Sequence, residues 1–437
     1  MDQFHELSSV NNSSTLKSDS NNKNKKRKQN RPYHYHDYAI FLVHYHKTGY
    51  VLSRELKHQV ISTLEIAANL ELPKVKKVQK NALSNYSNLA QFEVSGINEE
   101  TGERVTFDQL GNWIQSAFPQ RQHLGATNCP AGPLSKRGKG KPIHTTRGTK
   151  FQLQSGTIHI QESPDLFCSV DDLLDAMSIA KAGTKIIHLI RNPFEMTMSN
   201  YFYHSQTPTP EKWVHTDEPC QHLYPNNRSL SSYVASTLTS WARNRADIPK
   251  VTQTDLDDIV DVCLTLWRNK DNLKNATFYE HLLKLDKTEA LRLATAQMTI
   301  ASSATNKYLA GGDLLRMANN IIKFENMQAS SSNIQVLSMP MGDFITDTKN
   351  ATMKFIDFVF GDDKKITHEM RLNLAEQRAE KYKNKKASNS HVMSNNASLT
   401  ESKEGLRQML ENDKHLGPIL NLTEVIVNEA LSLNTQM

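Results

Sequence analysis

The sequence predicts an α/β protein with a doubly wound, mostly parallel sheet, flanking helices and helical insertions. Short apolar runs alternate with helical patterns along the chain. The runs are apolar at nearly every position, as strands buried on both faces of a parallel sheet must be. We expect strands at 38–45, 156–161, 185–190 and 334–339. Strands that alternate with helices favour one parallel sheet with helices on both faces.

The first strand reads YAIFLVHY at 38–45 and is followed by HKTG at 46–49. Apolar side chains then recur every four residues from Leu52 to Ala68, which predicts an amphipathic helix. We therefore expect a strand–loop–helix unit, with the loop at the carboxyl end of the strand.

The third strand, KIIHLI at 185–190, ends in Arg191-Asn192-Pro193. Asn192 with Glu195 three residues later is a capping pattern, and proline suits the first turn of a helix. A helix should therefore begin here. Further helices are expected over about 170–182, within 236–330, and over about 347–360, 367–383, 403–412 and 419–433.

The charge distribution divides the chain into a leader and a body. Residues 1–31 carry seven basic and three acidic side chains, whereas the remainder carries 45 basic and 43 acidic ones. We interpret 1–36 as a disordered basic leader and 37–437 as a single domain with insertions at about 80–150 and 205–330. Within 80–150 only the segment 107–118 is patterned. The nearly neutral body argues against a nucleic-acid-binding fold.

No run of about 18 apolar residues is present, so no membrane span is predicted. The amino-terminal segment also has no apolar core of a signal peptide. These features predict a cytoplasmic protein, with the Golgi lumen and the nucleus as alternatives.

Ionisable side chains follow three of the expected strands. Lys47 follows the first, Glu162 the second and Arg191 the third. Ligands of open α/β sheets bind beyond the carboxyl ends of the strands. The three groups should therefore face one crevice.

Two of these strand ends have features of anion sites. A turn with Gly49 that opens onto a helix presents backbone N–H groups, and Lys47 adds a point charge. Lys47 precedes the glycine, so the loop is not a Walker A sequence. At the other strand end, Arg191 and Ser199 form a second candidate pocket, unless Arg191 only pairs with a local acid such as Glu195. Together, the two sites suit a ligand with two separated anionic groups.

These motifs resemble those of the sulfotransferases that use 3′-phosphoadenylyl sulfate (PAPS). The segments that carry the resemblance are HYHKTGYVLS at 44–53, IIHLIRNPFEMTMSNYFYH at 186–204, and the strand–helix unit at 334–361. The resemblance implies a P-loop NTPase-like sulfotransferase fold. It also implies PAPS as co-substrate, adenosine 3′,5′-bisphosphate as product and no metal.

The resemblance further implies a role for each matching residue. Lys47 would contact the phosphosulfate bridge and stabilise the leaving phosphate. Arg191 and Ser199 would grip the 3′-phosphate. The 5′-phosphosulfate would be held by the backbone N–H groups of Thr48, Gly49, Tyr50 and Val51.

An acceptor hydroxyl or amine also needs a base. Glu162 falls where cytosolic members of the family have a histidine, and it is the first candidate. His159 and His204 are the next candidates, and His46 flanks the loop. Each histidine is more readily explained as an ordinary hydrogen-bonded core or surface residue, and the same alternative applies to Glu162.

The sequence thus predicts an enzyme that transfers a sulfuryl group from PAPS to a small-molecule or glycan acceptor. The alternatives are a P-loop kinase that uses ATP and magnesium, and an inactive nucleotide-binding scaffold. The sequence does not identify the acceptor or the oligomeric state.

Overall fold

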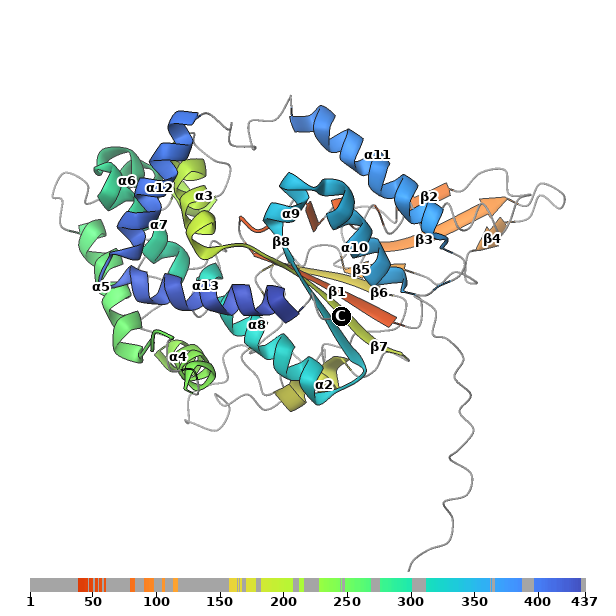
Figure 1. The fold of residues 1–437 in the computed structure, drawn as a ribbon, viewed down its shortest axis with the longest axis horizontal. Helices are drawn as coiled ribbons and strands as arrows, with labels where there is room; N and C mark the ends of the chain where they lie inside the picture. The colour runs from red at the N-terminus through yellow and green to blue at the C-terminus, as the bar shows by residue number, and fades with distance from the viewer. Residues whose placement is uncertain are drawn as a thin grey trace, which may run out of the picture. The chain divides into compact units, whose positions relative to one another are not determined.

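A computed structural model gives the fold of the chain (Figure 1). The residues that it describes belong to one compact unit, 34–437. The expected leader at 1–36 lies outside them. The described residues are 38–45, 47–49, 52, 53, 55, 56, 59, the backbone of 79–82, 90–97, 104–106 and 113–116, and then 157–162, 164, 166, 170–177, 182–206, 212–215, 228–243, 245, 248–268, 276–300, 312–361, 363, 366–386 and 397–433.

Four adjacent parallel strands form one part of the sheet. They are β6 (Thr157–Glu162), β1 (Tyr38–His44), β7 (Gly183–Ile190) and β8 (Ile334–Pro340), in that spatial order, with β8 at the edge of the sheet. These are the four strands expected from the sequence, and an α/β architecture is therefore observed. Because the strands are parallel, their carboxyl ends lie at one edge of the sheet.

The sheet continues beyond β6 into a segment that we had expected to be an insertion. Strand β5 (Trp113–Ser116) is parallel to β6, and β3 (Ala90–Ile97) pairs antiparallel with β5. Strands β2 (Gln79–Ala82) and β4 (Arg104–Thr106) both pair with β3. Except for β5, which falls in the patterned segment, these strands were missed because their sequences do not form apolar runs.

Successive residues of β1 face opposite sides of the sheet and enter two separate cores. Phe41 and Val43 belong to a large core shared with helices on one side, whereas Ile40 and Leu42 belong to a smaller core on the other. Helices α8 and α13 contribute to the large core, and α10 and α11 to the smaller one (Figure 1).

Most of the remaining described residues are helical, and helix α4 begins earlier than the expected start of the helical region at 236. The helices are α2 (Val170–Met177), α3 (Pro193–Gln206), the 3-10 helix η3 (Lys212–His215), α4 (Arg228–Ala242), α5 (Gln253–Arg268), α6 (Phe278–Lys284), α7 (Lys287–Ile300), α8 (Asp313–Ser330), α9 (Met341–Thr346), α10 (Thr348–Phe360), α11 (His368–Lys386), α12 (Ala397–Glu411) and α13 (Leu416–Leu433).

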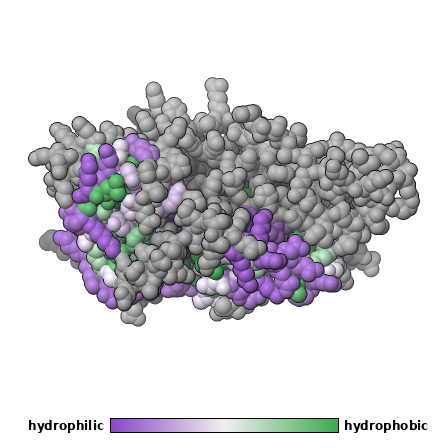
Figure 2. All heavy atoms as spheres, turned by 90° about the horizontal axis from the view of Figure 1, so that it is seen from above, coloured by the Kyte–Doolittle hydropathy of each residue, from purple (hydrophilic) through white to green (hydrophobic). Residues whose placement is uncertain are grey.

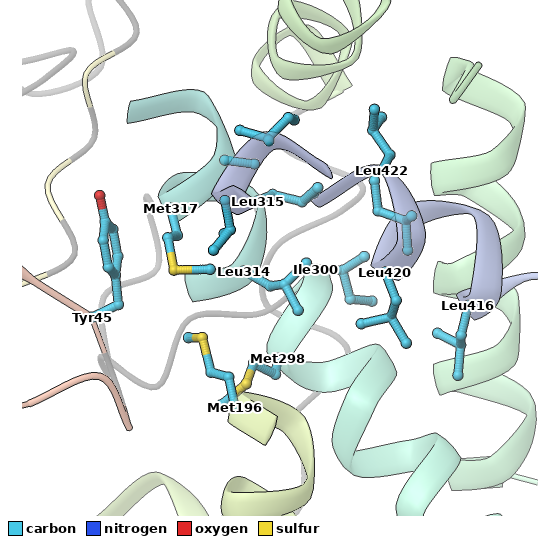
Figure 3. Close-up of a cluster of buried hydrophobic side chains, with 14 of the residues drawn as sticks. Tyr45, Met196, Met298, Ile300, Leu314, Leu315, Met317, Leu416, Leu420 and Leu422 are labelled. Atoms are coloured by element: carbon cyan, nitrogen blue, oxygen red, sulfur yellow. The ribbon is translucent and has the colours of Figure 1, made fainter. Parts of the chain in front are cut away.

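The large core fills the space between α3, α7, α8 and α13. Figure 3 shows the side chains of Met196, Met298 and Met317 close together in this core, with Tyr45 beside Met317 at its margin. Methionine is flexible and fills irregular gaps, which suits a core formed by several helices at different angles.

The described part of the surface in Figure 2 is mostly hydrophilic, with small hydrophobic areas. The large hydrophobic side chains that are exposed among the described residues are Leu283, Ile345 and Leu433. No helix that these residues form has the length and apolarity needed to cross a membrane.

Two carboxylates lie close together where α13 packs against α8. Burial, together with the nearby charge of Glu429, raises the pKa of Glu325 to about 7. Arg245 opposes this rise, but its guanidinium is bound to Glu429 through two hydrogen bonds of 3.2 and 2.9 Å. Glu325 is therefore partly protonated near neutral pH in the folded protein.

We expect Glu325→Gln to stabilise the protein at high pH and not at low pH. A carboxyl group whose pKa is raised by folding loses its contribution to stability as the pH rises from about 4.5 to about 7. In thermal unfolding at pH 8, the variant should have a Tm about 2–4 °C above wild type, and the difference should disappear by about pH 4. The exposed Glu404→Gln is the control. Equal pH profiles for Glu325→Gln and wild type would contradict this assignment.

Candidate functional site

The loop after β1 is closed by hydrogen bonds between two buried residues, Tyr45 and Thr48. The N–H and the hydroxyl of Thr48 both donate to the Tyr45 carbonyl, each at 3.0 Å. The Tyr45 N–H donates in return to the Thr48 hydroxyl oxygen at 2.6 Å. The Thr48 N–H is thus engaged inside the loop, and the structure does not direct it toward a ligand as the resemblance implies.

Gly49 allows the chain to pass closely over the carboxyl ends of two strands. Its φ is +136°, and an added Cβ would lie 3.2 Å from Leu189 and 3.4 Å from the sulfur of Met341. The Gly49 carbonyl accepts a hydrogen bond from the Ser53 N–H at 2.7 Å, so the next helix begins here. The start of a helix therefore lies at the strand ends, and a helix N-terminus favours the binding of an anion. His46, Tyr50 and Val51 lie outside the described residues.

Lys47 contacts the second motif through both its backbone and its side chain. Its backbone is left-handed, with φ +62°, a conformation that few residues other than glycine adopt. The Lys47 carbonyl accepts a hydrogen bond of 3.0 Å from Nη1 of Arg191. The Lys47 ammonium lies over the ring of Tyr203, 3.1 Å from its centroid. The two sequence motifs therefore meet in space.

Arg191 also forms the local ion pair that we considered as an alternative. Its Nε lies 3.5 Å from Oε2 of Glu195, whose side chain is 57% exposed, whereas that of Arg191 is 16% exposed. Burial lowers the pKa of Arg191, and Glu195 opposes this effect. An arginine remains a cation under such conditions. An incoming anion would therefore meet a fixed positive charge with one carboxylate beside it.

Asn192 caps α3 as the sequence predicts, and the C-terminal helices hold it in place. Its side-chain oxygen accepts hydrogen bonds from the N–H groups of Phe194 (3.0 Å) and Glu195 (3.3 Å). Its amide nitrogen donates to the carboxylate of Glu424 on α13. Arg407 of α12 donates to both oxygens of Glu424 at 3.0 Å. The amide can therefore present only its oxygen to the helix N-terminus.

Ser199 is half-buried on α3, one turn before Tyr203. Residues four apart lie on the same face of a helix. The hydroxyl of Ser199 and the ring that contacts Lys47 are thus on one side of α3.

The backbone register places two of the candidate bases, Glu162 and His159, at different positions along β6. Glu162 is the last residue of β6 and pairs with His44, three residues before Lys47. His159 lies three residues inside β6 and pairs with Phe41. Glu162 is therefore at the same edge of the sheet as the loop, and His159 is in the interior of a strand.

His204 is a poor candidate for a base. It is fully buried, and burial lowers its pKa to about 2, with a smaller contribution from the positive charge of Lys47. A general base works best when its pKa is near the operating pH. His204 is therefore a neutral and weakly basic group beside Lys47.

A buried polar network beneath the strand ends was not expected from the sequence. The Tyr45 hydroxyl is hydrogen-bonded to Nε2 of His188 (2.7 Å). The amide nitrogen of Asn320, on α8, donates to the Tyr45 oxygen (2.9 Å) and to the Pro164 carbonyl (2.8 Å). Burial lowers the pKa of His188 to about 3 and raises that of Tyr45, so both groups are neutral. The Tyr45 hydroxyl thus accepts a hydrogen bond from Asn320 and shares a second one with Nε2 of His188.

This network joins the two segments that carry the loop lysine and the candidate base. Tyr45 lies two residues before Lys47, and Pro164 lies two residues after Glu162. The signals that point to it in the sequence are a histidine within the apolar run KIIHLI and a polar pair, Asn319-Asn320, between apolar residues. Both residue types are usually hydrogen-bonded when they are buried.

The described residues include several groups that could bind an anion. Among the same residues, no three His, Cys, Asp or Glu side chains are grouped so that they could hold a metal ion. The groups that could hold phosphate or sulfate are the cations of Lys47 and Arg191, the hydroxyl of Ser199 and the helix start at Gly49.

Comparison of the chain with protein-family models, with curated proteins and with solved structures gives no match.

We expect Tyr45→Phe to lower the free energy of unfolding by about 1–3 kcal/mol, because Nε2 of His188 loses its buried partner and Asn320 loses one of its acceptors. Urea unfolding followed by circular dichroism measures the change. Tyr279→Phe is the matched control, since Tyr279 is a half-buried tyrosine packed beside His215. Equal losses in the two variants would show that the network contributes no specific stability.

Proposed function

We propose that the protein is a sulfotransferase that transfers a sulfuryl group from PAPS to an acceptor hydroxyl or amine, on a P-loop NTPase-like sulfotransferase fold. The observation that carries the proposal is the hydrogen bond from Arg191 to the carbonyl of Lys47. It joins the two cationic motifs, which are 144 residues apart in the sequence, at the ends of neighbouring parallel strands. A ligand with two separated anionic groups matches this arrangement.

Each group has a definite task in the proposed reaction. Arg191 and Ser199 bind the 3′-phosphate, and the helix start at Gly49 binds the 5′-phosphosulfate. The acceptor oxygen or nitrogen forms a bond to sulfur while the bond from sulfur to the bridging oxygen breaks. The bridging oxygen leaves with the electron pair, and the ammonium of Lys47 stabilises its developing charge.

The proton of the acceptor must go to a base at the same edge of the sheet. Glu162 is the best-placed candidate by backbone position, because β6 ends at this residue. The buried bonds from Asn320 to Pro164 and Tyr45 support its segment relative to the loop. A carboxylate base favours a carbohydrate as the acceptor, and a small molecule is the alternative acceptor.

Nucleotide binding tests the proposal without knowledge of the acceptor. Calorimetry should show that adenosine 3′,5′-bisphosphate binds more tightly than ADP, with the same affinity in magnesium and in EDTA. Lys47→Ala and Arg191→Ala should each weaken binding at least about tenfold, because each removes a charge-assisted contact. Lys349→Ala is the control, because Lys349 forms an exposed ion pair with Glu376 (2.7 Å) elsewhere.

Circular dichroism should show that both site variants remain folded. A preference for ADP that requires magnesium would favour the kinase instead. If neither nucleotide binds, the sulfotransferase proposal is wrong.

Glu195→Gln should strengthen binding of adenosine 3′,5′-bisphosphate about two- to fivefold, because the anion no longer meets a carboxylate beside Arg191. The gain should decrease at high salt, since Glu195 is exposed. Glu369→Gln is the matched control, because Glu369 is an exposed glutamate in the first turn of α11. Unchanged or weaker binding by Glu195→Gln would place the anion away from Arg191.

A further inference from the structure

The ammonium of Lys47 has a defined place on an aromatic ring. Its Nζ lies 3.1 Å from the centroid of Tyr203, inside the distance of about 6 Å within which a cation is attracted to a ring face. Tyr203 belongs to the last turn of α3, which ends at Gln206. The carbonyl end of a helix carries partial negative charge, which adds to the attraction.

The ring that holds Lys47 is itself supported by a neutral neighbour. The His204 ring packs edge-on against Tyr203, with centroids 4.9 Å apart and an interplanar angle of 74°. Burial, and then the charge of Lys47, lower the pKa of His204. The imidazole therefore stays uncharged and does not repel the ammonium.

Both the backbone and the ammonium of Lys47 have defined contacts. Its carbonyl is bound by Arg191, its backbone is left-handed, and its ammonium lies over Tyr203. A lysine side chain loses much rotational freedom when it is fixed, and a binding site gains affinity if that freedom is already restricted. Ser199 lies one turn of α3 before Tyr203, about 5.4 Å along the helix axis and on the same face.

We propose that Tyr203 is a positioning residue for Lys47. The ring face fixes the ammonium next to the sulfuryl donor but leaves its charge intact, because a ring attracts a cation without carrying an opposite charge. This inference rests on the proposed sulfotransferase function and gives a role to Tyr203, a residue to which the resemblance assigns none.

A double-mutant cycle separates this role from a general effect on folding. Calorimetry with adenosine 3′,5′-bisphosphate should show about three- to tenfold weaker binding for Tyr203→Leu. Tyr203→Phe retains the ring face and should bind within about twofold of wild type. In the Lys47→Ala background, Tyr203→Leu should cause no further loss, because the two residues act together.

The position of the ammonium can also be observed without nucleotide. In NMR spectra, the ε-methylene protons of Lys47 should resonate upfield of other lysines, since they lie over a ring face. Their signal is assigned by its loss in Lys47→Ala. The upfield shift should persist in Tyr203→Phe and disappear in Tyr203→Leu.

The outcomes distinguish this inference from the function on which it rests. If wild type does not bind adenosine 3′,5′-bisphosphate, the proposed function fails and the inference fails with it. If wild type binds but Tyr203→Leu binds equally well or more tightly, only the role of Tyr203 is overturned. An equal loss in both Lys47 backgrounds would also overturn it, because the effect would then not act through the lysine.

Discussion

The candidate site depends on the way in which Tyr45 is held. Its backbone closes the loop through Thr48, and its hydroxyl lies in a buried network with His188 and Asn320. Buried polar groups are costly unless they are paired, so this arrangement has few alternatives of similar energy. The loop that presents Lys47 therefore leaves the sheet in one direction, fixed by β7 and α8 as well as by β1.

The second motif, which begins at Arg191, is held in place by the C-terminal helices α12 and α13. Glu424 and Arg407, on α13 and α12, hold Asn192 so that it caps α3. Arg407 also lies over the ring of Phe194, 4.6 Å from its centroid, in the first turn of the same helix. Substitutions in the C-terminal helices can therefore alter the position of Arg191, even if those helices do not contact a ligand.

Local patterns in the sequence were sufficient for the parallel strands and for the cap of α3, because each depends on a few consecutive residues. They were not sufficient for β2, β3 and β4, whose pairing compensates for sequences without apolar runs. The same limit applies to the site. Lys47, Arg191 and Ser199 stand out in short motifs, whereas Tyr203 and Asn320 acquire a role only when distant elements pack together.

The charges of the site are arranged so that its cations do not depend on pH near neutrality. Arginine and lysine side chains ordinarily remain protonated at these values. The buried histidines around them, His44, His188 and His204, all have a lowered pKa because burial disfavours the imidazolium form. Protonation of any of them would add a third positive charge, and protonation of His188 would also alter its hydrogen bond with Tyr45. By keeping these rings neutral, the fold retains two cations at separate strand ends, which is the arrangement that a ligand with two anionic groups requires.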